Sequence, residues 1–347
     1  MRGGGWPIGA WRWAGARASV LPVLLAAVAL LASPAAAQRW AIDDPGQGPV
    51  ALERGLPGAR ELSGLSWAGG DRYAAVSDDD GSLYWLRIAI DPADGYISGA
   101  TAEGRLPLAN SSDLEGVSLA PDGTSVVVSD EVGPALREYR LPDGQLERAA
   151  ALPPVFATLR YNLGLEALTR DQSGQFWTGN EEALKVDGPT STAEKGTLVR
   201  LLRLDGDLRP TGQWAYRTDP IAGAQMLSDH GTGLSELAAL PDGRLIALER
   251  SFGSEGLRIR LYEVEIDGAT EVSKIPALAD AEVVPAPKQL LWQHAFLRDN
   301  FEGMAIGPPL ADGSRSLVLV SDDGHALAQA LYALRLRQAA SPSPRPH

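Results

Sequence analysis

One hairpin-like phrase recurs five times along the chain, and this recurrence constrains the fold more than any other feature. Each copy holds an apolar run, a turn rich in Gly, Asp or Pro, a second apolar run and then, in most copies, acids. The copies are "LSGLSWAGGDRYAAVSDDD" (62–80), "LEGVSLAPDGTSVVVSDE" (114–131), "LEALTRDQSGQFWTGNEE" (165–182), "LSELAALPDGRLIALERS" (234–251) and "FEGMAIGPPLADGSRSLVLVSDD" (301–323). Short apolar runs separated by such turns are typical of β-hairpins. The repeat therefore indicates that one supersecondary unit has been copied to build the domain.

Each copy is followed by a third apolar run, and the first four continue through a turn into a fourth, more polar run. The sequence therefore predicts an all-β fold of four-stranded antiparallel blades arranged as a β-propeller. Five blades are visible, and the wider spacing of the later copies leaves room for a degenerate sixth. The fifth copy lacks a fourth strand, so we expect the N-terminal segment "GPVALERGL" (48–56) to complete it and close the ring. We expect long loops at 185–195, 217–232 and 278–294, where specificity usually resides.

The first 37 residues differ in composition from the rest of the chain. They hold three arginines and no acid, then an apolar run from Val20 to Leu31, and they end in three alanines. This order is typical of an export signal cleaved near Ala37, and the apolar run is shorter than the ~18 to 20 residues of a membrane span. We expect residues 1–37 to be a signal peptide, 38–338 a single propeller domain and 339–347 a disordered tail. The mature protein would then be periplasmic or secreted, with no membrane span.

The chain is strongly acidic, with 44 Asp and Glu against 31 Lys and Arg and a formal net charge of −13. Such a surface repels phosphate backbones, which argues against nucleic acid as a partner and favours cations. The chain has no Cys, which excludes disulfides and anchoring through a lipidated Cys. Its four histidines are far apart in sequence, which disfavours zinc. We expect a monomer that acts on a small molecule.

The hairpin pattern predicts that acids from distant parts of the chain meet at one rim. In an antiparallel hairpin the start of the first strand lies beside the end of the second, and the first strand of a propeller blade lines the central channel. The residues expected there are Glu115, Glu166 and Glu302 from first strands and Asp78, Asp130 and Asp322 from second strands. So many carboxylates cannot all ionise without a counter-charge, and we expect them to bind calcium through six to eight oxygens. The alternative is that these acids form turns and bind nothing.

The fourth copy breaks the acidic pattern. It reads "ALERSFGSEG" and so places Arg250 on the acidic rim, near an insertion that carries His230. We expect Arg250 to stabilise negative charge on a ligand and His230 to act as a general base. The alternatives are that Arg250 neutralises Glu249 or another neighbour and that His230 is an ordinary loop residue. The sequence contains no G-x-S-x-G elbow, phosphate loop or dinucleotide fingerprint.

Several of these motifs together resemble the phytase-like β-propeller family, which is labelled esterase-like activity of phytase. They are "ELSGLSW", "DLEGVSLAPDG", "LPDGRLIALERSF" and "NFEGMAIGPPLADGSRSLVLVSDD". The resemblance spans roughly residues 60 to 336, and the last two motifs, followed by Gln329, are its most specific parts. It implies an exported propeller that hydrolyses a phosphomonoester or an ester with the assistance of calcium.

The chain also departs from this family pattern. Members often read "SDDNF" at the last motif, where this chain has "SDDGH". Arg250 is the one basic residue expected on the rim itself, and nearby loops carry Arg160, Lys195 and Arg298. Binding of a polyphosphorylated ring needs several basic residues. Phytate is therefore disfavoured as a substrate. The alternative function is a non-enzymatic envelope propeller that binds a ligand or a protein and holds calcium only for structure.

Overall fold

The computed structural model describes Met1 and residues 39–52, 56, 59–223, 231–322 and 329–339. Apart from Met1, the described residues lie within one compact unit, Gln38–His347. The predicted export signal beyond Met1, the candidate base His230 and residues 340–347 of the predicted tail lie outside the described residues. Within the described part no helix has the length and apolar character needed to cross a membrane.

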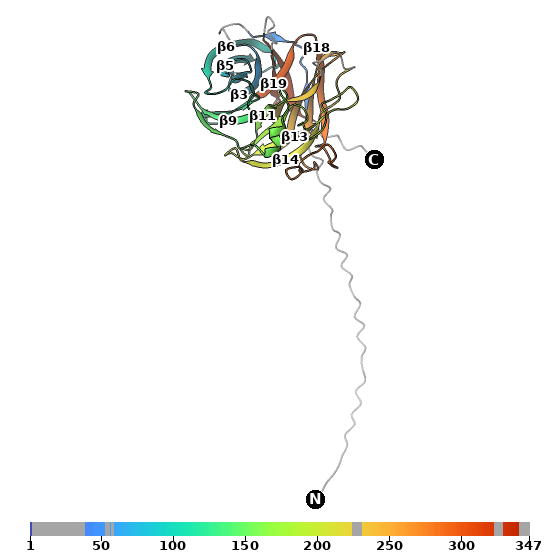
Figure 1. Ribbon diagram of the computed structural model, residues 1–347. Helices are drawn as coiled ribbons and strands as arrows, with labels where there is room; N and C mark the ends of the chain where they lie inside the picture. The colour runs from blue at the N-terminus through green and yellow to red at the C-terminus, as the bar shows by residue number, and fades with distance from the viewer. Residues whose placement is uncertain (2–38, 53–55, 57–58, 224–230, 323–328, 340–347) are drawn as a thin grey trace. The chain divides into compact units, whose positions relative to one another are not determined.

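Five antiparallel sheets surround a central axis and form a five-bladed β-propeller (Figure 1). The first, inner strands are β3 (Leu62–Gly69), β7 (Leu114–Leu119), β11 (Leu165–Arg170), β15 (Thr232–Ala239) and β19 (Asn300–Pro309). The second strands are β4 (Arg72–Ser77), β8 (Ser125–Asp130), β12 (Phe176–Asn180), β16 (Leu245–Gly253) and β20 (Arg315–Asp322). The inner strands contact one another in a closed ring, β3 to β7 to β11 to β15 to β19 and back to β3.

The outer half of each blade is also antiparallel. The third strands are β5 (Ser82–Ile90), β9 (Ala135–Arg140), β13 (Leu198–Leu204), β17 (Gly256–Val264) and β21 (Ala330–Gln338). The fourth strands are β6 (Ile97–Pro107), β10 (Leu146–Ala149), β14 (Pro210–Arg217), β18 (Lys288–Phe296) and β1 (Trp40–Asp43). A short 3-10 helix, Pro154–Thr158, follows the second blade. Five blades account for all five sequence repeats, so the sixth blade that the spacing allowed is not formed by the described residues.

Apolar side chains pack between neighbouring blades. Five clusters of buried residues lie one at each of the five boundaries, and a smaller sixth cluster covers the outer edge of the third blade. A strand with an apolar neighbour on both faces reads as a continuous apolar run. All six residues of β8, "SVVVSD", are buried for this reason. The burial of these faces is the main force that holds the blades together.

An N-terminal strand closes the ring, as the sequence predicted, but it begins earlier than expected. β1 pairs with β21 from Trp40↔Gln338 to Asp43↔Arg335. Within its described residues the predicted segment contributes β2 (Val50–Ala51), which pairs with the start of the same strand. The two short strands are separated by "DPGQGP", whose prolines cannot donate to the ladder and whose Gly46 and Gly48 have positive φ. The closing strand is therefore split in two by its own turn residues.

One predicted insertion proves to be partly a strand. Residues 278–294 were expected to form a loop, yet Lys288–Phe296 is β18, the fourth strand of its blade. The loop lies before β18 and runs along the third blade, where Glu271 forms an isolated β-bridge with Trp214. The fully buried Arg200 holds this loop in place, because its guanidinium donates hydrogen bonds to the carbonyls of Val272 and Ile275. The sequence predicted that a turn joins the third and fourth strands of this blade, whereas a long loop separates β17 from β18.

Candidate functional site

Every inner strand carries a β-bulge at the same place in the repeat. The register with the second strand shifts between Leu62 and Gly64 in the first blade, and equivalent shifts occur in the other four. The residues at the bulges are Ser63, Glu115, Glu166, Ser235 and Glu302. A bulge leaves a residue out of the ladder and re-aims its side chain. The repeat therefore sets five side chains at one level of the ring, at an opening that we call the carboxylate mouth.

The residue after the bulge allows the inner strands to approach closely. A Cβ on Gly64 would lie 2.3 Å from the carbonyl oxygen of Glu115, and one on Gly303 would lie 2.1 Å from that of Ser63. Only glycine tolerates such an approach of one backbone to another. The three glutamates at the bulges are crowded together because the strands beneath them nearly touch.

The fourth blade has Glu236 at this position instead of a small residue. Its side chain is buried and accepts hydrogen bonds from the backbone N–H groups of Leu168 (2.8 Å) and Leu237 (2.9 Å), and so ties the fourth blade to the third. Burial raises the pKa of Glu236 well above its usual range, against these backbone donors, which lower it. Sequence reasoning missed this residue, although the aligned repeats show Glu where the others have Gly or Ala.

Two groups of three carboxylates stand at the carboxylate mouth. Cluster 1 consists of Glu61, Asp78 and Asp322, and its ligand oxygens lie within 4.8 Å of one another. The neighbouring Ser63 is buried, and its hydroxyl has no hydrogen-bond partner among the described residues; the same holds for Oδ1 of Asp78. Burial raises the pKa of Asp78 to about 8, and the charges of Asp322 and Glu302 add to the shift. Buried oxygens without protein partners beside three acids suit a hard cation.

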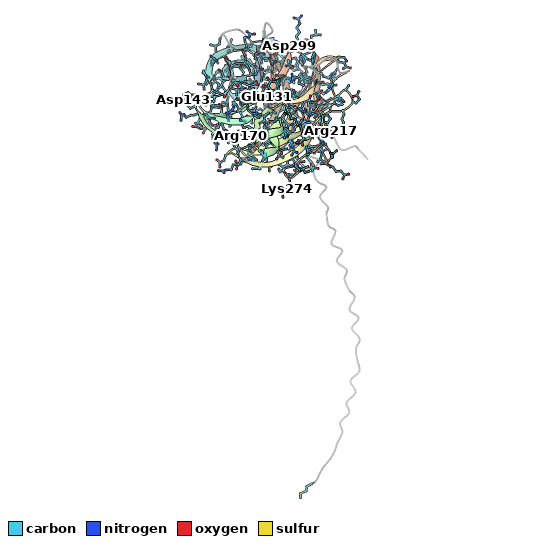
Figure 2. The ribbon with its side chains drawn as sticks, in the orientation of Figure 1. Glu131, Asp143, Arg170, Arg217, Lys274 and Asp299 are labelled. Carbon is cyan, nitrogen blue, oxygen red and sulfur yellow. The ribbon has the colours of Figure 1, made fainter. Side chains whose placement is uncertain are left out.

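Cluster 2 consists of Asp113, Glu115 and Glu131, again with ligand oxygens within 4.8 Å of one another. Glu131, labelled in Figure 2, accepts a hydrogen bond of 2.6 Å from the backbone N–H of Gly164. Burial raises the pKa of Glu131 to about 7, and for Glu115 burial and the charge of Glu302 raise it well above the usual range. Asp130, the expected ligand here, instead forms an ion pair with Arg137, so the geometry favours its neighbour Glu131.

Arg250 lies among these acids and binds two of them. Its Nη2 is 2.7 Å from Oε1 of Glu181, and its Nη1 is 2.9 Å from Oε1 of Glu302. Glu249, considered as its partner from the sequence, faces elsewhere and accepts from Lys288 and the Tyr216 hydroxyl. Burial raises the pKa of Glu302 to about 7 although the charge of Arg250 lowers it. Arg250 therefore neutralises part of the mouth.

The charges at this mouth are only partly compensated. Glu166 is buried, and the described residues give its carboxylate no hydrogen bond. Its pKa is raised well above the usual range by burial and by the charges of Glu115 and Glu181. In the absence of a cation these carboxyls relieve the repulsion by holding protons near neutral pH. A bound cation would release those protons.

The profile of the family described as phytase-like, esterase-like activity of phytase, matches residues 57–325. The chain belongs to this family. A search of curated proteins gives no match. Among solved structures, an endo-arabinase from Bacteroides thetaiotaomicron is similar at 13% identity and a TM-score of 0.46, over 88% of this chain and 99% of that one.

Two further solved structures are similar to the phytase-like chain at lower TM-scores. The PQQ-bound aldose sugar dehydrogenase from Streptomyces coelicolor has 14% identity and a TM-score of 0.38, over 84% of this chain and 98% of that one. The Kuenenia stuttgartiensis hydrazine synthase has 11% identity and a TM-score of 0.35, over 78% of this chain, which spans only 59% of that one.

A cavity of about 500 Å³ adjoins cluster 2 of the phytase-like site. Asp113 and Glu131 form one side of it, and a wall that includes Phe156 forms another. Arg160 lines it but is held by the carbonyls of Ala183 and Gly188, whereas the side chain of Lys185 makes no hydrogen bond or ion pair within the described residues. The cavity thus offers a small molecule an apolar wall and a cationic side chain next to a cluster of acids.

Proposed function

We propose that the protein is an exported, calcium-dependent hydrolase that cleaves a phosphomonoester or an ester at the carboxylate mouth. The observation that carries the proposal is the convergence of clusters 1 and 2 at one end of the ring, beside Arg250. Membership in the phytase-like family supports a hydrolase of this class. Fold and family alone do not determine chemistry, so the proposal rests on the side chains at the mouth.

The donor set fits calcium. Both clusters offer only carboxylate oxygens, and the unpartnered Ser63 hydroxyl adds a neutral oxygen beside cluster 1. Calcium prefers such oxygens and tolerates irregular geometry. Cluster 1 and cluster 2 would each hold an ion. When bound, the ion supplies positive charge that polarises the phosphoryl or carbonyl oxygen of a substrate.

The chain's own residues can bind the substrate and move protons. Glu302 has a pKa of about 7 and can donate or accept a proton near neutral pH, which suits general acid–base chemistry. Arg250 fixes the orientation of Glu302 through its 2.9 Å ion pair. The cavity beside cluster 2 would accept the apolar part of the substrate, with Lys185 near its anionic group.

A second candidate function is a binding propeller of the envelope in which calcium is only structural. The observation that favours it is that Arg250 is already engaged by Glu181 and Glu302, and so is not directed at a ligand. The partner would then be a small envelope ligand or a protein held by the same mouth.

We also propose that residues 1–37 direct export and that the protein acts as a periplasmic or secreted monomer. The basic, apolar and small-residue segments of this leader support the proposal. Fractionation of cells that express the full chain, with sequencing of the mature N-terminus, tests it. Recovery of uncleaved protein in the cytoplasm would contradict it.

The test of the hydrolase begins with the calcium response. The purified protein is stripped with a chelator, titrated with calcium and followed by thermal unfolding. Calcium at about 100 times its Kd should stabilise it by about 2.7 kcal/mol per site. Hydrolysis of p-nitrophenyl phosphate, p-nitrophenyl acetate and a lactone is then measured with and without calcium.

Three variants separate the candidates. Glu115→Gln and Asp78→Asn should each reduce both the calcium response and the hydrolysis. Glu236→Gln is the matched control, because this buried acid binds backbone N–H groups and lies outside both clusters; its calcium response should be unchanged. Stabilisation by calcium without any turnover would favour the binding propeller, and a melting temperature insensitive to calcium would refute both functions.

A further inference from the structure

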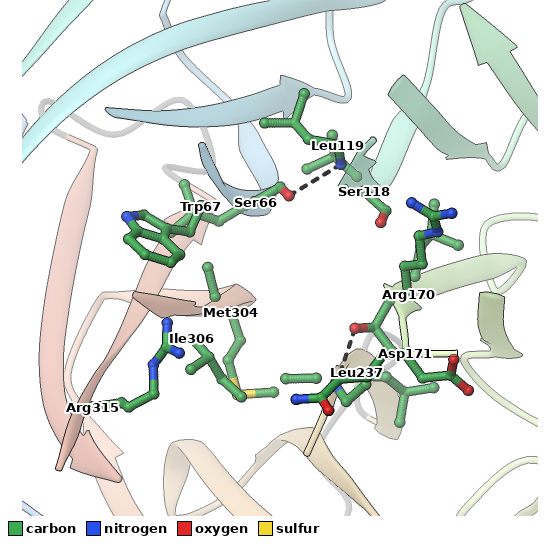
Figure 3. A pocket seen from close by; sticks show the side chains of 18 of the residues that line it. Ser66, Trp67, Ser118, Leu119, Arg170, Asp171, Leu237, Met304, Ile306 and Arg315 are labelled. Atoms are coloured by element: carbon green, nitrogen blue, oxygen red, sulfur yellow. Dashed lines mark hydrogen bonds between the residues drawn. The ribbon is translucent and has the colours of Figure 1, made fainter. Parts of the chain in front are cut away.

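A second cavity of about 290 Å³ lies at the opposite mouth of the ring, which we call the turn mouth (Figure 3). All five blades line it, through residues near the ends of their inner strands such as Trp67, Leu119, Arg170, Ala239 and Ile306. Trp67 lies four residues beyond the bulge at Ser63, or about 13 Å along an extended strand. The cavity is therefore distinct from the carboxylate mouth.

An apolar layer separates the two mouths. It consists of the residues two positions after each bulge, Leu65, Val117, Leu168, Leu237 and Met304, which are all buried. The same five residues line the cavity at the turn mouth and give it an apolar floor. A ligand in this cavity would rest on hydrocarbon, out of contact with the acids on the other side.

Two arginines from different blades stand at the edge of this cavity, on opposite sides in Figure 3. Arg315 donates to the carbonyl of Gly307 (Nε, 3.0 Å) and lies over the ring of Trp67, 5.1 Å from its centre. Arg170 donates weakly to the carbonyl of Gly174 (3.4 Å). Neither guanidinium forms a salt bridge with a carboxylate of the described residues.

The acids near this mouth are engaged with their own turns. Asp171 lines the cavity, but its carboxylate accepts from the N–H groups of Ser173, Gln175 and Trp177. Asp122 is exposed; hydrogen bonds from Thr124 lower its pKa, and the charge of Arg170 contributes less. Burial lowers the pKa of Arg315, with no carboxylate to offset it. In a chain with net charge −13, two arginines without ion pairs at one cavity form a local site for negative charge.

We propose that the turn mouth binds a small organic anion, a carboxylate or phosphate with an apolar body, whose charged group is held by Arg170 and Arg315. The apolar body rests on the floor around Leu168 and Met304. Ser118 lines the cavity and adds a hydroxyl that has no hydrogen-bond partner among the residues that the structure describes. The volume lies near the lower end of the ~300 to 1,000 Å³ typical of ligand sites, so the ligand is small. This site is independent of the proposed hydrolase.

The probes are benzoate, phenyl phosphate and the neutral isostere benzamide, measured by titration calorimetry in a chelator that removes calcium from the other mouth. Benzoate or phenyl phosphate should bind at least tenfold more tightly than benzamide. The stronger of the two identifies the anionic group as carboxylate or phosphate. Equal binding of benzamide, or no binding by either anion, would overturn the proposal.

Variants assign the binding to the two arginines. Arg170→Gln should weaken binding of the preferred anion about tenfold; because this side chain makes one long hydrogen bond, the variant should fold. Arg315→Gln should weaken it as much, with circular dichroism to confirm folding. Arg203→Gln is the matched control, since Arg203 also stacks on a Trp ring (4.7 Å from the centre of Trp214) but lies outside the cavity. Equal affinity in Arg170→Gln and the control would overturn the assignment.

Discussion

The two mouths of the ring are built from the same five strands yet have opposite chemistry. The strand starts present glutamates and two clusters of acids, whereas the strand ends surround an apolar floor flanked by Arg170 and Arg315. The backbone repeat is the same at both ends. The comparison shows that the repeat fixes the level at which a side chain stands and leaves the chemistry of each level to individual substitutions.

The largest difference should appear in the response to pH. Asp78, Glu131 and Glu302 have folded-state pKa values of about 8, 7 and 7, raised from 3.8, 4.5 and 4.5, chiefly by burial. The folded state therefore binds more protons than the unfolded state. Each raised pKa contributes a stabilisation that is complete below the unfolded-state pKa, decreases as pH rises, and is lost once pH passes the folded-state pKa of about 7 or 8. Each unit of pKa shift is worth about 1.4 kcal/mol, so without calcium the free energy of unfolding should fall by several kcal/mol between pH 5 and pH 9.

Denaturant unfolding at each pH, with chelator or with calcium, measures this effect. Saturating calcium should remove the loss, because the ion favours the ionised carboxylates. The Arg170→Gln variant at the turn mouth should follow the same curve as the natural protein. A stability that stays constant or increases from pH 6 to pH 9 in chelator would contradict the assigned protonation.

A smaller effect is expected when both mouths are disturbed together. Gly303→Ala places a Cβ 2.1 Å from the carbonyl oxygen of Ser63 and 2.7 Å from Val320, so the inner strands must move apart. The expected cost is about 2 kcal/mol, with weaker binding of calcium at one mouth and of the anion at the other. Gly99→Ala is the control, because its Cβ would meet nothing within 4 Å. Unchanged binding at both mouths would show that the shared wall does not set their geometry.

The smallest effect on stability should follow Arg250→Gln. This side chain retains 27% exposure and the freed carboxylates can take up protons, so the expected cost is about 1 kcal/mol. Calcium should bind more tightly, because a competing positive charge has been removed. Arg87→Gln is the matched control, since Arg87 also bridges two acids, Asp71 (2.5 Å) and Glu103 (2.6 Å), far from the mouth. An unchanged calcium affinity would mean that Arg250 does not compensate the clusters.

Most of the fold was predictable because it is repeated. Alternating apolar runs and turns define hairpins locally, and five copies reveal the ring. The closing strand was harder to locate, because "RWAID" matches no repeat and its partner β21 lies at the other end of the chain. Strand β18 was missed for a similar reason, since a long excursion separates it from the rest of its blade.

The sequence predicted the location of the candidate site better than it predicted which residues belong to it. Hairpin geometry placed Glu115 and Glu302 correctly at one level, because position within a repeat determines height. It selected Asp130, whereas the geometry favours Glu131, since side chains of adjacent strand residues point to opposite faces and the bulge alters the register. Glu61 was also missed, because it precedes the aligned repeat, and its positive φ of 47° is not visible in a sequence pattern.

The closure of the ring has a consequence for how the chain reaches its native state. Trp40 pairs with Gln338, so the last blade joins the first strand in the sequence to the last. Contacts between such distant residues form slowly, because a long loop must close before they are made. Strand β1 has no strand to pair with until β21 has been synthesised. Until then the other blades fold in a ring that is still open. The same adjacency means that joining the two ends and cutting the chain at a turn between blades should preserve the structure.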